Sequence, residues 1–178
     1  MKNCIIIGGG IIGLCSAYYL QKEGHRVTII DQSNMDGGAS YVNAGYISPS
    51  HIIPLSAPGV VKKGIQWRFH PSSPFYVKPR ADKDFLKWAW AFNKSCNPAH
   101  VKKAIPVIRD ISVMSHELYE DIQKEKGFDF HFEKKGLLML CQTEKMLEEE
   151  VKLAALAKEA GLEAHVKNQK ELQDLEPN

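Results

Sequence analysis

The chain has 178 residues, 44% hydrophobic and 25% charged, and its 23 Lys and Arg against 21 Asp and Glu give a net charge of +2. This composition is typical of a globular protein and excludes a disordered tail or a fibre. A net charge this small creates no field for a polyanion, so no nucleic acid is expected as a partner, and no apolar run reaches the roughly 20 residues of a membrane-spanning helix.

The first thirty residues predict a strand, a helix and a second strand. Residues 4–7 form a β-branched apolar run, typical of a parallel strand that is buried on both faces. A helix is expected to follow the glycine-rich segment 8–13 and to end near residues 21–23, with Gly24 at its C-terminal end. The second strand, residues 26–30, stops at Asp31.

The glycine spacing indicates a dinucleotide-binding loop. Gly8 allows a tight turn, Gly10 lets the backbone approach a pyrophosphate, and Gly13 lets helix and strand pack closely. Free N–H groups at the start of the helix favour bound phosphate. The acidic residue 18 positions after the last glycine is expected to accept hydrogen bonds from a ribose diol and to repel a 2′-phosphate, which disfavours NADP. The predicted adenosine and pyrophosphate contacts are Gly8, Gly10, Ile11, Ile12, Gly13 and Asp31.

This fingerprint does not separate NAD from FAD, but the next segment resembles FAD-dependent amine and amino acid oxidoreductases. Residues 35–49 are rich in small and hydroxyl-bearing side chains, which would let a planar ring lie against the backbone. Residues 40–49 and 57–60 are most similar to FAD-dependent D-amino acid dehydrogenases, and the similarity continues more loosely to residues 175–177. The resemblance implies flavin-side contacts at Ala39, Ser40, Asn43, Ala44 and Gly45.

One position departs from the family pattern. Several relatives carry Thr or Ser where this chain has Ala39, so Ser40 alone would supply a hydroxyl contact there. The resemblance implies that a D-amino acid loses hydride from Cα to the flavin, that the imino acid hydrolyses to a 2-oxo acid and ammonia, and that a quinone-linked acceptor reoxidises the flavin.

Two alternatives stay open at this point. An oxidase of the same superfamily would act on glycine, sarcosine or D-amino acids with dioxygen, and an inactive dinucleotide-binding fragment would catalyse nothing. The sequence assigns no catalytic residue. Its seven histidines show no spacing typical of a metal site, so no metal is expected.

A proline-rich connection occupies residues 49–80. Six of the chain's nine prolines lie in it, which excludes a core strand or a long helix. Its aromatic residues favour an ordered cover over the cofactor site rather than a disordered linker. These residues are Trp67, Phe69, Phe75 and Tyr76.

The remainder predicts helices and short strands. Helices are expected over residues 82–94, 106–126, 143–160 and 169–175, with Pro106 in a first turn, Thr143 as an N-cap and Gly161 as a C-cap. Strands are expected over 128–132, 136–142 and 165–167, with a hairpin turn at 133–136. The apolar face of the 82–94 helix favours core packing, with a membrane-surface role for its lysines as the alternative.

The sequence therefore predicts an α/β protein with a Rossmann-like FAD-binding βαβ unit and the start of an α+β substrate or cap domain. The predicted segments are the N-terminal part of the FAD-binding domain (1–48), the cover (49–80) and the helical and hairpin part of the cap domain (81–178). Two parallel strands are not stable alone, so the sheet is expected to be incomplete. Related enzymes are more than twice as long, and the chain is interpreted as an N-terminal part that is inactive by itself.

Location and partners complete the expectations. The N-terminus has no signal-peptide core, and the four scattered cysteines form no CxxC pair, which favours reduced thiols in the cytoplasm. The expected partners are a small D-amino acid and a quinone-linked electron acceptor. The acceptor implies a peripheral contact with the inner face of the cell membrane.

Overall fold

The computed structural model describes residues 1–67, 80 and 82–177. The chain divides into two compact units, Met1–Tyr46 and Ile47–Asn178. The predicted segment boundaries at residues 48 and 80 stay a prediction. Of the aromatic residues assigned to the cover, Phe69, Phe75, Tyr76 and the side chain of Trp67 lie outside the described residues. No helix in the described ranges is long and apolar enough to cross a bilayer.

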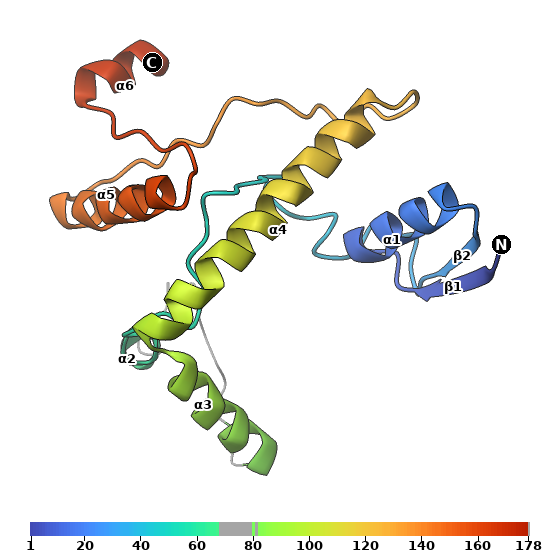
Figure 1. Cartoon of the computed structure of the whole chain (residues 1–178), viewed down its shortest axis with the longest axis horizontal. Helices are drawn as coiled ribbons and strands as arrows, with labels where there is room; N and C mark the ends of the chain where they lie inside the picture. Colours follow the sequence, from blue (N-terminus) through green and yellow to red (C-terminus); the bar gives the residue numbers. More distant parts are fainter. Residues whose placement is uncertain (68–79, 81, 178) are drawn as a thin grey trace. The chain divides into compact units, whose positions relative to one another are not determined.

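The first unit is the predicted βαβ unit (Figure 1). Strand β1 (Asn3–Ile7) is followed by helix α1 (Ile11–Lys22) and strand β2 (Arg26–Ile30). The two strands pair in parallel, with Asn3 opposite Arg26 and Ile7 opposite Ile30. The fold class is confirmed here as mixed α/β, with a two-stranded, incomplete sheet.

Helix α1 ends at the predicted glycine. Gly24 has a φ of +81°, a conformation that glycine adopts without a Cβ penalty. Its N–H donates to the Gln21 carbonyl at 2.9 Å, and the His25 N–H donates to the Leu20 carbonyl at 3.0 Å. These two bonds form a Schellman motif, which satisfies carbonyls left open at the helix end.

The two faces of the sheet differ in burial. Cys4 and Ile6 are half-buried, and Ile6 lies against α1 close to Gly13. On the other face, Ile5 is 68% and Ile7 87% exposed. The prediction of burial on both faces is therefore wrong for the described residues of this unit, because α1 covers one face only.

The second unit is built from helices, and side chains cap the starts of α3, α4, α5 and α6. The helices are α2 (Val60–Trp67), α3 (Lys83–Ser95), α4 (Pro98–Lys124), α5 (Glu144–Glu159) and α6 (Gln169–Leu175). Asp82 accepts from the Phe85 N–H at 2.7 Å, and Thr143 accepts from the Met146 N–H at 3.3 Å. Gly161, with a φ of +80°, ends α5 as expected.

Helix α4 differs from the prediction at its start. It begins at Pro98, and Pro106 lies inside the helix rather than in its first turn. The true N-cap is Asn97, whose side-chain oxygen accepts the His100 N–H at 2.9 Å. A proline at the first helical position loses no hydrogen bond, so the Asn97-Pro98 pair is a strong start signal.

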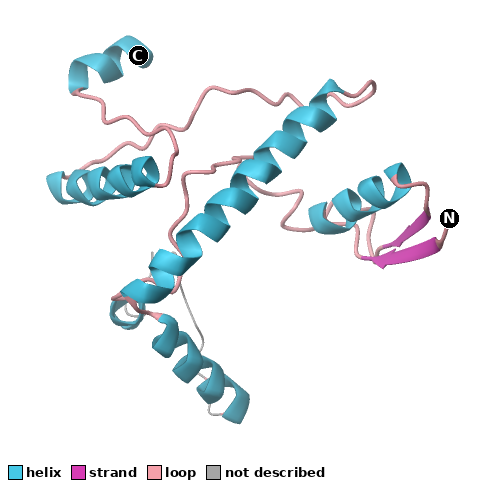
Figure 2. Ribbon diagram, viewed as in Figure 1, coloured by secondary structure: helices cyan, strands magenta, loops and turns pink. Residues whose placement is uncertain are grey.

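The predicted strands at 128–132, 136–142 and 165–167, and the hairpin turn at 133–136, are wrong. Figure 2 draws these segments as loops, and β1 and β2 are the strands of the described residues. Alternating side chains make a strand only when a neighbouring backbone completes the ladder. Residues 128–142 lack such a partner among the described residues.

The phenylalanines of this segment pack on a helix instead. The Phe132 ring lies 6.4 Å from the Tyr119 ring and 5.5 Å from the His116 ring, centroid to centroid. The Lys134 ammonium pairs with the Glu120 carboxylate, also on α4. The alternation thus reflects packing of one side of an extended segment against α4.

Candidate cofactor-binding site

The glycine loop between β1 and α1 is closed tightly against the sheet. The Gly8 N–H donates to the Ile30 carbonyl at 2.8 Å, and Gly8 has a φ of +104°. A Cβ on Gly13 would lie 2.0 Å from the Gly8 carbonyl oxygen and 3.3 Å from Ile6. Gly13 therefore has the close-packing role expected of the third glycine, and no larger residue fits without moving the backbone.

The start of α1 presents backbone N–H groups with few protein acceptors. Gly10 is the N-cap and offers no side-chain cap, and the first intrahelical bond runs from the Leu14 N–H to the Gly10 carbonyl at 2.9 Å. The first four N–H groups of a helix, here those of residues 10–13, have no acceptor within it. Ser40 supplies an acceptor for one of these four groups, since its hydroxyl oxygen accepts the Ile11 N–H at 3.0 Å. The site retains positive potential for an anion.

Asp31 lies beside this loop at the end of β2. One carboxylate oxygen accepts the Gly9 N–H at 2.7 Å. The other accepts both the N–H and the hydroxyl of Ser33, each at 2.8 Å. The bond from Gly9, followed by those from Ser33, holds the pKa of Asp31 below its usual value, so the carboxylate is ionised at neutral pH.

Two residues near Asp31 were missed by sequence reasoning. Gly9 is buried and donates to Asp31, and a Cβ there would lie 2.6 Å from the Met35 side chain, which would have to move aside. Ser33 completes a turn around the Asp31 side chain. The available signals were the middle glycine of the Gly8–Gly10 run and a Ser two positions after an Asp, a common Asx-turn arrangement.

Asn43 organises the loop that was predicted to face the flavin. Its amide nitrogen donates to the Ala39 carbonyl at 3.2 Å and to the Ser40 carbonyl at 3.0 Å. Its amide oxygen accepts the Gly45 N–H at 2.7 Å, and Gly45 has a φ of +68°. All the hydrogen-bonding groups of this side chain therefore serve the loop's own backbone.

The predicted residues fall into two groups. Hydrogen bonds and close packing connect the glycine loop, Asp31 and Ser40, whereas Ala39, Asn43, Ala44 and Gly45 form an exposed loop that continues from Ser40. The first group can hold an anionic group and a diol. The second offers a backbone surface with small side chains to a flat ring. Within the described ranges, His, Cys, Asp and Glu form no cluster of three that could hold a metal.

The glycine loop, the helix start with open N–H groups and the acidic residue at the strand end define a dinucleotide-binding domain. The family model described as FAD dependent oxidoreductase matches residues 3–178. The chain belongs to this family of FAD-dependent oxidoreductases, and its cofactor is FAD. No solved structure matches the chain.

The local geometry fits FAD. The N–H groups of residues 10–13 suit a pyrophosphate, and a side chain at Gly10 would approach the Ser40 hydroxyl at 3.2 Å. A cavity of about 710 Å³ also occurs in the second unit, where α5, the 137–141 segment and the buried Ile52 line it. Its lining, which combines apolar with charged residues, contributes none of the predicted cofactor contacts.

Proposed function

We propose that the protein is an FAD-dependent D-amino acid dehydrogenase, which converts D-amino acids to 2-oxo acids and ammonia and passes electrons to a quinone-linked acceptor. The family match supports the oxidoreductase class. The finer assignment rests on residues 40–49, which resemble D-amino acid dehydrogenases. The observation that supports it in the structure is that this loop reaches the start of α1, where Ser40 accepts the Ile11 N–H.

The proposed FAD contacts follow the geometry of the first unit. The N–H groups of residues 10, 12 and 13 would hold the pyrophosphate together with the Ser40 hydroxyl, whose oxygen accepts the Ile11 N–H. The ionised Asp31 would accept from the ribose hydroxyls. The loop of residues 39–45 would lie against the flavin. The proposed contacts are Gly8, Gly10, Ile11, Ile12, Gly13, Asp31, Ala39, Ser40, Asn43, Ala44 and Gly45.

FAD, when bound, supplies the two-electron oxidation of the substrate amine. The residues of the first unit contribute positioning and charge. The positive end of α1 would balance the phosphate charge, and Asn43 would keep the loop backbone in one conformation through its three hydrogen bonds. Water would then hydrolyse the imino acid to the 2-oxo acid and release ammonia.

The test compares two electron acceptors on the FAD-loaded protein expressed from its complete reading frame, because the 178 residues are interpreted as only its N-terminal part. We expect D-alanine to reduce an artificial quinone-like dye under anaerobic conditions, with pyruvate and ammonia formed in equal amounts. L-alanine is the stereochemical control and should give no reduction. Rapid oxygen consumption with hydrogen peroxide as product would instead support the oxidase alternative.

Flavin retention provides a separate readout. A yellow protein with stoichiometric FAD and no activity towards D-amino acids, glycine or sarcosine would overturn the dehydrogenase proposal and support the inactive dinucleotide-binding alternative. The proposed location is the cytoplasm, with the acceptor at the inner face of the cell membrane. Cell fractionation would test this location independently of the assay.

A further inference from the structure

Positive charge is concentrated in the middle of the chain. Residues 37–108 contain ten Lys and Arg against two Asp, a net charge of +8, whereas the whole chain carries +2. The residues outside this range therefore carry a net −6. Such an asymmetry is typical of a protein that meets an anionic surface with one region.

Helix α3 lies within this basic region and has two different faces. One face carries Phe85, Ala89 and Phe92, which are all half-buried. The Trp88 ring lies 5.7 Å from the Phe85 ring and 5.4 Å from the Phe92 ring, so these aromatic side chains pack together. This face is the less exposed side of the helix.

The other face combines lysines with exposed apolar side chains. We define the α3 basic stripe as Lys83, Leu86, Lys87, Trp90 and Lys94. Their spacing of three or four residues places them along one side of a helix. Leu86 is 59% and Trp90 67% exposed, and the Lys94 ammonium lies 5.3 Å from the centre of the Trp90 ring. Asp84 lies outside the stripe.

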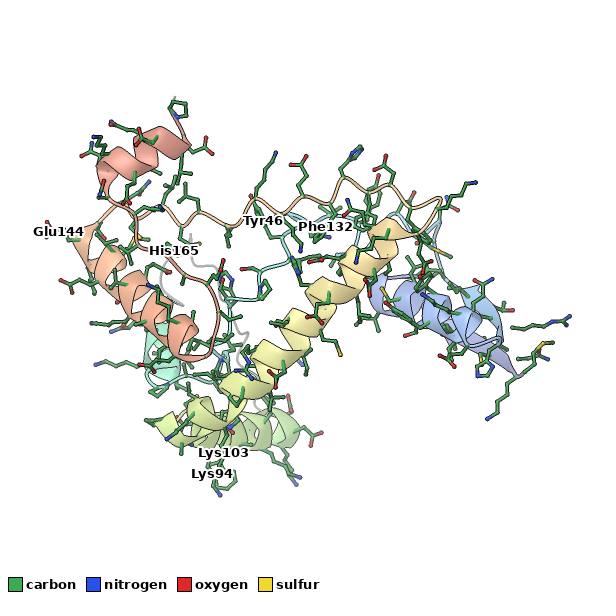
Figure 3. All side chains as sticks on the ribbon, turned by 45° about the horizontal axis from the view of Figure 1, so that its top comes forward. Tyr46, Lys94, Lys103, Phe132, Glu144 and His165 are labelled. Atoms are coloured by element: carbon green, nitrogen blue, oxygen red, sulfur yellow. The ribbon has the colours of Figure 1, made fainter. Side chains whose placement is uncertain are left out.

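The basic surface continues beyond the end of α3. Cys96 and Asn97 alone separate α3 from α4, whose first turns carry the exposed Lys102 and Lys103. Figure 3 labels Lys94 and Lys103 where α3 ends and α4 begins. Among the described residues, the ion pairs do not include any lysine of the stripe, nor Lys102 or Lys103. Their charges are available to an external anion.

We propose that the α3 basic stripe docks on an anionic lipid surface. Lysines beside exposed Trp and Leu suit a bilayer interface, because the ammonium groups meet lipid headgroups while the apolar side chains enter the boundary below them. A nucleic acid or an acidic protein would use the lysines but would leave Leu86 without a favourable environment. The inference rests on the proposed function, because docking would bring the protein to a quinone in the membrane.

The test measures sedimentation of the FAD-loaded full chain with lipid vesicles. Vesicles of phosphatidylcholine alone are compared with vesicles that also contain phosphatidylglycerol, at low and at high salt. We expect binding only to the anionic vesicles, a blue shift of tryptophan fluorescence on binding, and release by high salt.

Substitutions locate the binding surface. The triple variant Lys83→Gln, Lys87→Gln, Lys94→Gln is expected to weaken vesicle binding about a hundredfold, because each lysine contributes about fivefold to the affinity for an anionic surface. The matched control changes three exposed α5 lysines by the same charge: Lys145→Gln, Lys152→Gln and Lys158→Gln. Trp90→Ala should weaken binding, and Trp90→Phe should restore most of it. Circular dichroism checks that each variant keeps the wild-type helix content.

Several results would overturn the inference. These are no binding to anionic vesicles at low salt, equal losses in the two triple variants, or Trp90→Ala binding like the wild type. Self-association that Trp90→Ala abolishes, without vesicle binding, would assign the stripe to a second copy of the chain. Vesicle binding is read without catalysis, so it can fail while dye reduction with D-alanine succeeds, and the reverse.

Discussion

The Asp31 carboxylate accepts the Gly9 backbone N–H at 2.7 Å, which connects the end of β2 to the glycine loop after β1. Its second oxygen is engaged by the N–H and hydroxyl of Ser33. The oxygen that accepts Gly9 retains a lone pair for a further donor, whereas Ser33 uses both acceptor sites of the other oxygen. Asp31 can therefore hold the loop and accept a ribose hydroxyl at the same time, and both tasks favour the ionised form.

Substitution of Asp31 by Asn should weaken FAD binding. An amide has one acceptor oxygen, so it can satisfy Gly9 or Ser33 but not both, and its NH₂ group would face an N–H donor. Because the variant loses a charge-assisted hydrogen bond that holds the glycine loop, we expect the FAD dissociation constant to rise about tenfold. Titration followed by flavin fluorescence measures it.

The control for this variant is Asp36→Asn, which removes the same charge from an exposed position in the following loop. It should bind FAD within about twofold of the wild type. Equal weakening by the two variants would mean that net charge, rather than the hydrogen bonds of Asp31, governs the affinity.

The lowered pKa of Asp31 also predicts a pH dependence of stability. A carboxylate with a depressed pKa in the folded state stabilises the fold fully above its unfolded-state pKa, about 3.9, and this contribution disappears as the pH falls through the folded-state value. The stability difference between wild type and Asp31→Asn should be constant above about pH 5 and shrink below about pH 4. Urea unfolding across this range measures it; a difference that grows on acidification would contradict the assignment.

Gly13→Ala should disrupt the first unit. The new methyl group would lie 2.0 Å from the Gly8 carbonyl oxygen, which is backbone and cannot rotate away. We expect a loss of about 3 kcal/mol in unfolding free energy and loss of FAD binding. Gly37→Ala is the matched control, because a Cβ there has no atom within 4 Å and its effect should stay within about 0.5 kcal/mol.

Asn43 should act on FAD through the loop backbone. Asn43→Ala removes all three hydrogen bonds, whereas Asn43→Asp keeps the acceptor for Gly45 and sets a negative charge against the carbonyls of Ala39 and Ser40. We expect Asp to weaken FAD binding more than Ala, each by about tenfold or more, and to shift the flavin absorption spectrum. Asn34→Ala, at an exposed loop position, is the control. Wild-type affinity in Asn43→Asp would show that the loop does not depend on these bonds.

Local signals were sufficient where the chain forms short-range structure. The βαβ unit follows from two apolar runs, a glycine loop and Gly24, which act within a few residues. The caps at Thr143 and Gly161 are also local, since each satisfies helix-end groups three to five residues away. These elements needed no knowledge of distant contacts.

Features that depend on a partner were predicted less well. The alternation at residues 128–132 correctly indicated one packed side but not that the partner is helix α4, where Phe132 meets Tyr119. Burial of both faces of β1 would require a second cover, on the face that carries Ile7, and the described unit does not provide it. The start of α4 differs from the expectation because a proline such as Pro106 fits a first helical turn as well as an interior position, whereas Asn97 is the residue that caps the helix.

The candidate site shows the same division. Glycine spacing and Asp31 could be recognised from sequence, because each follows from a fixed position in a βαβ unit. The bonds of Asn43 could not, since the side chain reaches back to carbonyls three and four residues earlier and forward to Gly45. Such contacts depend on the loop conformation, which Gly45 permits through its positive φ.

The interior position of Pro106 gives α4 two halves of different robustness. The helix has 27 residues, a length of about 40 Å, and proline has no N–H to donate to the carbonyl of residue 102. The ladder is therefore interrupted near its first third, while the stretch that carries His116, Tyr119 and Glu120 is continuous and anchored by side chains. Amide protons around residues 102–107 should exchange with deuterium sooner than those around 115–121, so the helix opens from its lysine-rich end first.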